Sequence, residues 1–272
     1  MRATTIRFLD YWLGVPACAL LTLLRGLASA AAAEGKPARP QKILFLKFIE
    51  QGATVLAQDA IRRATQVVGR DNLFFCVFES NRAILDLLDT VPAGNIISIR
   101  DQRFVPFAID FLRAAWTVRA KRIDAVIDME FFSRASAIFT FLTGATTRVG
   151  LHRFTGELPY RGDLMTHRVQ YLPHLHISLQ YSVLVEAACH DPNELPMLKV
   201  PLAHITGAPS APPRFVPDAD DLRRMRERLH AGTSSPIVVG YRYSIRIHSR
   251  PSTPSSDRSR RASAPRSPRS MP

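Results

Sequence analysis

Side chains that could do chemistry gather in two stretches of the sequence. In the first, the apolar run 43–48 contains Lys47 and is followed by Glu50, Gln51 and Gly52. A strand that enters a helix through a glycine turn places backbone N–H groups at the carboxyl edge of a sheet, where open α/β folds bind ligands. Gly52 either helps to build such a site or only closes a turn. The pattern alone favours the turn, because turns are far commoner than sites.

The second stretch, 128–134, follows another apolar run. It combines the carboxylates of Asp128 and Glu130 with the hydroxyl of Ser133 and the guanidinium of Arg134, beside a predicted helix start. Such groups can orient a sugar or hold a phosphate. An equally favoured interpretation is a helix capped by Ser133, with a local carboxylate–arginine pair.

A third candidate loop, 151–154, offers the cation of Arg153 and the imidazole of His152, although a solvated loop is the favoured interpretation. Three further histidines lie close together in the sequence, at positions 167, 174 and 176. No acidic ligand pattern accompanies them, so we expect no metal site there. Three widely spaced cysteines argue against a disulfide framework and fit a reducing compartment.

Around these residues, predicted strands and helices alternate along the chain. Predicted strands cover 43–48, 73–78, 95–99, 123–128 and a short segment from Arg148. Predicted helices follow Gly52 and cover 81–88, 104–119, 133–143 and 175–188. This rhythm predicts an α/β fold, with a Rossmann-like, doubly wound and mostly parallel sheet.

Charge is concentrated at the end of the chain. The formal net charge is +13, of which 241–272, with eight Arg and one Asp, supply +7 and leave +6 on 1–240. The remaining basicity is compatible with a phosphorylated ligand or an anionic membrane surface and is specific to neither.

The N-terminal segment 1–40 contains an apolar run, 12–24, followed by a Lys/Pro-containing linker. The run is short for a membrane span, which needs about 20 residues. We favour a helix that lies on a membrane surface or packs on the domain. A signal peptide, suggested by Ala28-Ser29-Ala30, and plain core packing are the alternatives.

Three blocks carry a resemblance to a known family: KILFLKFIEQGATVLAQDAIRRA, IDMEFFSRASAIFTFLTGATTRVGLHR and HLHISLQYSVLVEAA. Over roughly 42–188 they resemble the N-terminal domain of family 9 glycosyltransferases, the ADP-heptose:lipopolysaccharide heptosyltransferases. The resemblance implies a GT-B architecture, in which one Rossmann-like domain, here 41–200, binds a glycolipid or saccharide acceptor. A second domain binds the nucleotide-sugar donor. It also implies a cytoplasmic protein, peripheral on the inner membrane, that builds the cell envelope.

The chemistry implied by the resemblance is inverting sugar transfer, without a metal or a further cofactor. The family pattern has an Asp after the glycine of the first turn as its proposed base, but here that position is Ala53. Glu50 and Glu130 are the replacement candidates for the base. The implied substrate-binding residues are Lys47, Gln51, Gly52, Ser133, Arg134, His152 and Arg153.

The chain departs from the family after residue 200. The segment 201–239 has the pattern of a linker, a helix at 220–230 and the first strand of a second domain, whereas 240–272 is Arg/Ser/Pro-rich and predicted to be disordered. We expect a frameshift after about Val239, which would leave the protein without its donor domain and inactive. A non-catalytic binding or scaffold protein at the membrane is the alternative. Nucleic-acid binding through the tail is the weakest hypothesis, because no recognised module precedes it.

Overall fold

The computed structural model describes residues 11–31, 39–152, 160–192 and 218–230. The chain divides into two units, 1–216 and 217–272, which are described separately. The predicted tail 240–272, the predicted strand near residue 237 and the predicted boundary at residue 200 all lie outside the described residues.

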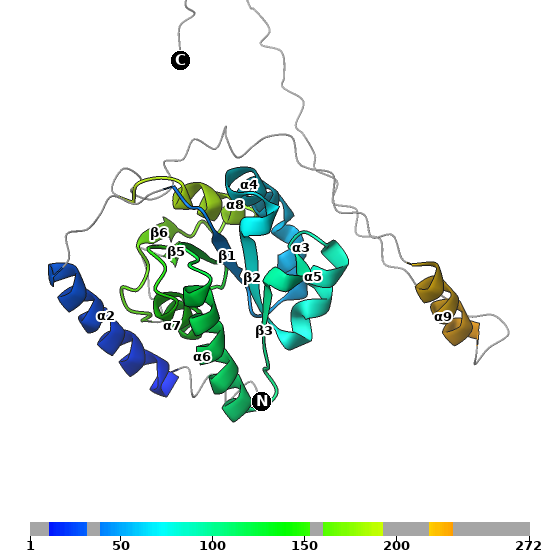
Figure 1. Ribbon diagram of the computed structural model, residues 1–272, viewed down its shortest axis with the longest axis horizontal. Helices are drawn as coiled ribbons and strands as arrows, with labels where there is room; N and C mark the ends of the chain where they lie inside the picture. The colour runs from blue at the N-terminus through cyan, green and yellow to red at the C-terminus, as the bar shows by residue number, and fades with distance from the viewer. Residues whose placement is uncertain (1–10, 32–38, 153–159, 193–217, 231–272) are drawn as a thin grey trace, which may run out of the picture. The chain divides into compact units, whose positions relative to one another are not determined.

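The first unit is built on a six-stranded parallel sheet (Figure 1). Its strands are β1 (Ile43–Leu46), β2 (Leu73–Phe78), β3 (Ile96–Ile99), β4 (Ala125–Asp128), β5 (Thr147–His152) and β6 (His167–Gln170). They lie in the order β3-β2-β1-β4-β5-β6, and every neighbouring pair is parallel. The predicted doubly wound sheet is therefore confirmed. Strand β6 was not predicted, because four residues that include His167 and Arg168 carry no clear apolar signal.

Helices cover both faces of the sheet. One face carries α3 (Gln51–Leu56), α4 (Gln58–Val68), α5 (Arg82–Leu88) and α8 (Ile177–Ala188). The other carries α6 (Phe104–Ala120) and α7 (Arg134–Leu142), and short 3-10 turns lie at Arg70–Asn72, Glu79–Asn81 and Ala93–Asn95. All four residues of β1 are buried: Ile43 and Phe45 face one helical layer, while Leu44 and Leu46 face the other. A continuous apolar run is what a strand covered on both faces requires.

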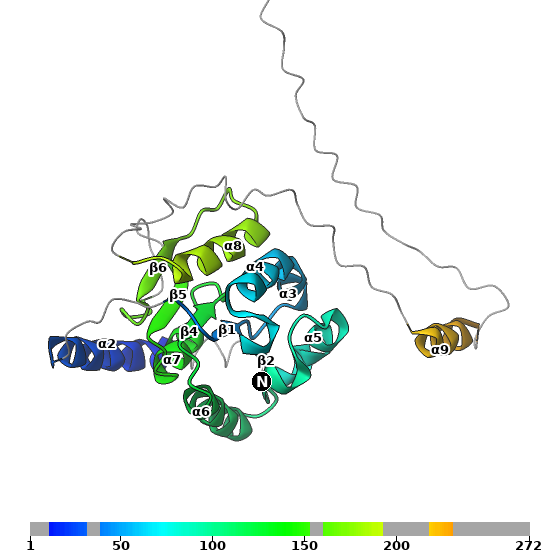
Figure 2. The same ribbon diagram turned by 45° about the horizontal axis from the view of Figure 1, so that its top comes forward.

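The N-terminal segment forms helix α2 (Gly14–Ala31), which packs beside α7 (Figure 2). Cys18 of α2 is buried with Ala137, Leu164 and Met165, and the Thr22 hydroxyl accepts a hydrogen bond from the Asp163 N–H at 2.9 Å. The predicted packing of this helix on the domain is thus observed. None of the helices in the described ranges is both long and apolar enough to cross a membrane.

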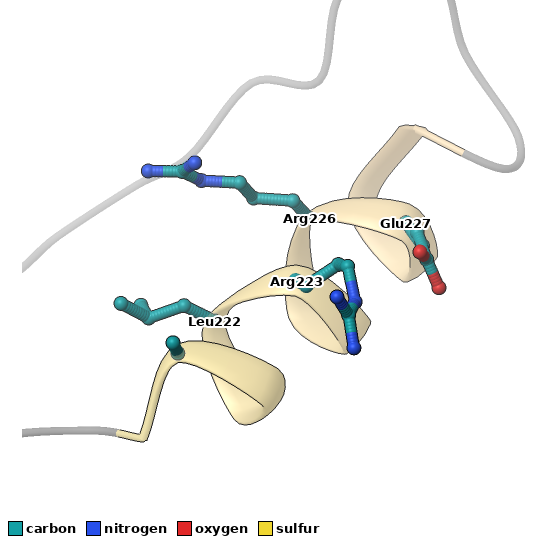
Figure 3. A pocket seen from close by; sticks show the side chains of 5 residues that line it. Leu222, Arg223, Arg226 and Glu227 are labelled. Atoms are coloured by element: carbon teal, nitrogen blue, oxygen red, sulfur yellow. The ribbon is translucent and has the colours of Figure 1, made fainter.

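In the second unit, the described residues form one helix, α9 (Ala219–His230), at the predicted position. A hollow beside it is lined by Ala219, Leu222, Arg223, Arg226 and Glu227 (Figure 3). All five residues belong to the same exposed helix, so the hollow brings together no groups from separate elements. We therefore place the candidate site elsewhere, at the sheet edge of the first unit.

Candidate functional site at the carboxyl edge of the sheet

The candidate site lies where β1 and β4 end side by side. The chain builds β1, β2 and β3 outward and then returns to place β4 on the other side of β1. Leu46 aligns with Asp128 in this pair, and the Met129 N–H donates to the Leu46 carbonyl at 3.0 Å. Such a reversal of strand order is where open α/β sheets bind ligands. It brings the two predicted stretches, 47–52 and 128–134, together.

Glu130 holds the loop after β1 in place. Its side chain is 9% exposed, and its Oε1 accepts hydrogen bonds from the N–H groups of Phe48 at 2.6 Å and Ile49 at 3.0 Å. Its Oε2 lies 3.2 Å from the Lys47 Nζ. Both carboxylate oxygens are thus engaged inside the protein, which suits a positioning residue better than a base.

Glu50 is the accessible carboxylate of the pair of candidate bases. Its side chain is 59% exposed, and its Oε2 lies 3.2 Å from the same Lys47 Nζ. Its backbone has a φ of 73°, in the left-handed region that residues other than glycine rarely adopt. Phe132, in the loop after β4, has a φ of 54°. Both loops therefore hold strained backbone, which tends to cluster at functional sites.

Lys47 joins the two carboxylates. Its side chain is 1% exposed, so the ammonium group is buried between Glu130 and Glu50, 5.7 Å from the centroid of the Phe131 ring. A buried cation is tolerated only where opposite charge compensates for lost hydration. Lys47 therefore acts as a fixed positive charge that orients the exposed Glu50.

Asp128 lies beneath this layer, fully buried. Its Oδ1 accepts from the Glu130 N–H at 3.0 Å and its Oδ2 from the Ser136 hydroxyl at 2.8 Å, while Arg161 Nη1 is 3.9 Å away. Burial raises the pKa of Asp128 to about 6, against the opposing effect of Arg161 and these hydrogen bonds. Asp128 thus supports the loop that carries Glu130.

The predicted glycine turn needs a correction. Gly52 is the second residue of α3 and does not have a positive φ; the left-handed turn residue is Glu50. A Cβ built on Gly52 would meet nothing within 4 Å. The glycine is therefore required neither by its backbone nor by a close neighbour, and the space beside it is open. Gln51 next to it donates from Nε2 to the Ser80 carbonyl at 3.3 Å.

The residues predicted around α7 face different partners. Ser133 caps the helix as expected, because its hydroxyl accepts from the Ser136 N–H at 3.3 Å. Arg134 is buried, donates from Nε to the Tyr160 carbonyl at 2.7 Å, and lies 5.9 Å from the centroid of the Tyr11 ring. Arg134 thus ties α7 to the segment that precedes α2.

His152 ends β5 and is half-buried. Burial lowers its pKa, and the nearby charges of Arg168 and Arg161 lower it further, so the neutral imidazole is favoured. Arg153, the other predicted residue of this loop, lies outside the described residues. Within the described ranges, no cluster of His, Cys, Asp and Glu could hold a metal ion.

Sequence reasoning missed two residues of this region. Arg161 comes from an irregular segment and also donates from Nη2 to the Leu151 carbonyl at 2.6 Å, but nothing in the sequence marks it. Tyr181 lies on α8 in an apolar pattern typical of a core residue. Its ring is fully buried, and burial raises the pKa of its hydroxyl, as do the charges of Glu130 and Glu50. The hydroxyl has no hydrogen-bond partner among the described residues.

Removing this hydroxyl should stabilise the protein. A buried polar group without a partner costs about 1–3 kcal/mol. We therefore expect Tyr181→Phe to raise the free energy of unfolding by about 1 kcal/mol, measured by urea denaturation. Tyr171→Phe is the control, because Tyr171 is only partly buried and should change stability little. A loss of stability in Tyr181→Phe would show instead that the hydroxyl is satisfied.

No protein-family model and no curated protein matches the sequence. Solved structures similar to the chain are family 9 glycosyltransferases and heptosyltransferases. A family 9 glycosyltransferase from Veillonella parvula is 12% identical, with a TM-score of 0.48 over 59% of this chain and 44% of that chain. The ADP-heptose lps heptosyltransferase II of E. coli is 15% identical, with a TM-score of 0.49 over 69% and 50%.

The E. coli heptosyltransferase WaaC, solved with ADP-2-deoxy-2-fluoro heptose, is 18% identical, with a TM-score of 0.45 over 54% of this chain and 48% of that chain. The chain spans about half the length of the solved structures that it matches.

Proposed function

We propose that the first unit is the acceptor-binding domain of an inverting glycosyltransferase that uses a nucleotide-sugar, with Glu50 as the base. The observation that carries this proposal is the position of Glu50. Its carboxylate is exposed, is held by Lys47, and lies at the carboxyl edge of the sheet where β1 and β4 end side by side. The three sequence blocks that resemble family 9 glycosyltransferases support the same assignment.

In the proposed sugar-transfer step, the first unit supplies one reacting group, the Glu50 carboxylate. The Glu50 carboxylate takes the proton of an acceptor hydroxyl. That oxygen then attacks the anomeric carbon of the donor, and the bond to the nucleoside diphosphate breaks, with inversion. Lys47 and Glu130 fix the backbone of the loop that carries Glu50. The acceptor would occupy the open space beside Gly52. The donor would bind on a second domain, as the resemblance implies, with no metal.

The acceptor proposed from the resemblance is a glycolipid of the lipopolysaccharide type, and the donor a nucleotide-sugar such as ADP-heptose. The first measurement is binding of lipopolysaccharide glycolipid that lacks its heptose to the chain itself, by titration calorimetry. We expect binding that Glu50→Gln changes less than about threefold, because a base contributes mainly to the transition state.

Transfer is then measured with the first unit joined to the donor-binding domain of a heptosyltransferase and supplied with ADP-heptose. We expect Glu50→Gln to lower kcat by about 10²–10⁴-fold, the usual contribution of a general base. Glu79→Gln is the matched control, because Glu79 is an exposed carboxylate that follows β2 at the same sheet edge. Equal activity in wild type and Glu50→Gln would exclude Glu50 as the base.

A non-catalytic binding protein is the second candidate, and Ala53 favours it. Ala53 stands where the family has its proposed base, and it packs partly buried against the core. This function would be supported if the first unit binds the acceptor but transfers no sugar when it is joined to a donor-binding domain. The basic segment 240–272, on which the nucleic-acid hypothesis rests, lies outside the described residues.

A further inference from the structure

Three helices form one layer on the same side of the sheet. α7 lies in the middle, with α2 on one side and α6 on the other (Figures 1 and 2). The α2 contact is made through Cys18 and Ala137, and the α6 contact through the rings of Phe111 and Phe139, whose centroids are 5.1 Å apart. The outer surfaces of α2 and α6 have no such neighbour among the described residues, and both are apolar.

The outer surface of α2 consists of apolar residues spaced three, four or seven apart, together with Trp12. Its large members are Leu20, Leu23, Leu24 and Leu27, and Trp12 and Leu13 lie just before the helix; all six are between 48% and 63% exposed. The charged residue of this helix, Arg25, is turned to the domain, where it pairs with Asp163 at 3.0 Å. Surface helices normally present polar residues to water, so an apolar outer surface indicates a missing partner.

Helix α6 also has an exposed apolar outer side. Its inner side is buried in the core through Phe111, Ala114, Ala115 and Val118. Its outer side carries Val105, Ile109, Leu112 and Trp116, between 55% and 70% exposed. Their spacing of four, three and four residues places them in one stripe along the helix. A helix that is apolar on both sides needs cover on both.

Positive charge flanks the stripe on α6. Arg113 and Arg119 are exposed, as are Lys121 and Arg122 just beyond the helix end. None of these four cations forms an ion pair within the described residues. The acidic residue of the helix, Asp110, pairs with Arg100 at 2.6 Å. The missing partner must therefore be apolar and also carry negative charge.

A lipid surface meets both requirements. Aliphatic side chains insert at the boundary of the acyl chains, cations meet anionic headgroups, and Trp and Tyr favour the interface between the two. Tyr11, Trp12 and Trp116 all lie exposed on these helices or at their start. A second copy of the chain fits less well, because its α6 would bring the same four positive charges, three arginines and one lysine, against the first set.

We propose that the outer surfaces of α2 and α6, here called the lipid face, dock the protein on an anionic membrane surface. The lipid face comprises the four exposed leucines of α2, Trp12 and Leu13 just before that helix, and the four residues of the α6 stripe. The inference does not depend on sugar transfer, although docking there would hold the domain beside a membrane-bound glycolipid.

The test is co-sedimentation of the full chain with vesicles of phosphatidylcholine alone or mixed with phosphatidylglycerol. We expect binding to the mixed vesicles that weakens in 0.5 M salt, since exposed charges are then screened. The double variant Leu23→Glu with Trp116→Glu should lower the apparent affinity by at least about tenfold, because it replaces two large apolar side chains that the proposal buries in lipid. Arg113→Gln with Arg119→Gln should weaken binding to the mixed vesicles only.

Leu87→Glu is the matched control, because Leu87 is an exposed leucine on α5, which covers the other face of the sheet. It should bind vesicles like the wild type. Circular dichroism confirms that each variant is folded, which the exposure of every altered residue favours. The proposal is wrong if the double glutamate variant binds as well as the wild type, or if the wild type binds no vesicle. It is also wrong if the variants abolish self-association and leave lipid binding unchanged.

Discussion

Glu130→Ala should lower the free energy of unfolding by about 3–5 kcal/mol, the usual loss when one partner of a buried ion pair is removed. The variant would leave the Lys47 ammonium without its buried counter-charge and the N–H groups of Phe48 and Ile49 without an acceptor. Domains of this kind are stable by about 5–15 kcal/mol, so the loss brings the fold close to unfolding. Urea denaturation followed by circular dichroism measures it.

Glu50→Ala is the matched control, because Glu50 pairs with the same Lys47 at the same 3.2 Å. Its carboxylate is mostly exposed and accepts no backbone hydrogen bond in the described part of the chain. The expected loss is less than about 1 kcal/mol, as for other exposed ion pairs. Equal losses in the two variants would contradict the division between a positioning Glu130 and an accessible Glu50. The loss of unfolding free energy in Glu130→Gln should lie between those of Glu130→Ala and Glu50→Ala, because glutamine keeps a hydrogen-bond acceptor but not the negative charge.

Most of the sheet could be predicted because β1, β2 and β4 are short apolar runs, as a parallel strand covered on both faces requires, whereas β6 carries no such signal. Once the winding is predicted, the adjacency of β1 and β4 follows, and with it the meeting of 47–52 and 128–134. The winding does not determine which carboxylate is buried. That depends on the left-handed backbone at Glu50 and on the turn at Phe132, which returns the chain towards α7. Single-residue conformations of this kind leave no periodic signal in a sequence.

The segments outside regular elements were the least predictable. Arg161 reaches Asp128 from a segment that α2 holds through Thr22 and Asp163, so its position depends on a helix more than 130 residues away in sequence. The outer stripe of α6 was hidden for the opposite reason. A sequence that is apolar on both sides of a helix predicts a helix buried in the core. Only the folded structure shows that the side with Val105 and Trp116 is exposed.

Stability should fall as the pH rises from about 4 to 6.5, because of Asp128. Its pKa is about 6 in the folded protein, raised by burial, against about 3.9 in an unfolded chain. Between these values the folded state keeps the proton that the unfolded state has released, so higher pH favours unfolding. Below pH 4 both states are protonated and the penalty vanishes. Above pH 6.5 the loss of unfolding free energy caused by Asp128 reaches its full value, on the order of 3 kcal/mol.

Asp128→Asn isolates this effect, because the amide keeps an acceptor for the Glu130 N–H but cannot ionise. Urea midpoints of both proteins at pH 4, 5, 6 and 7 give the difference in unfolding free energy. We expect that difference to shift in favour of the variant as the pH rises. Asp110 does not interfere, because Arg100 lowers its pKa to about 2, below the window. A constant difference would mean that Arg161 and Ser136 offset the burial of Asp128 and keep it ionised, as an anionic support beneath Glu130.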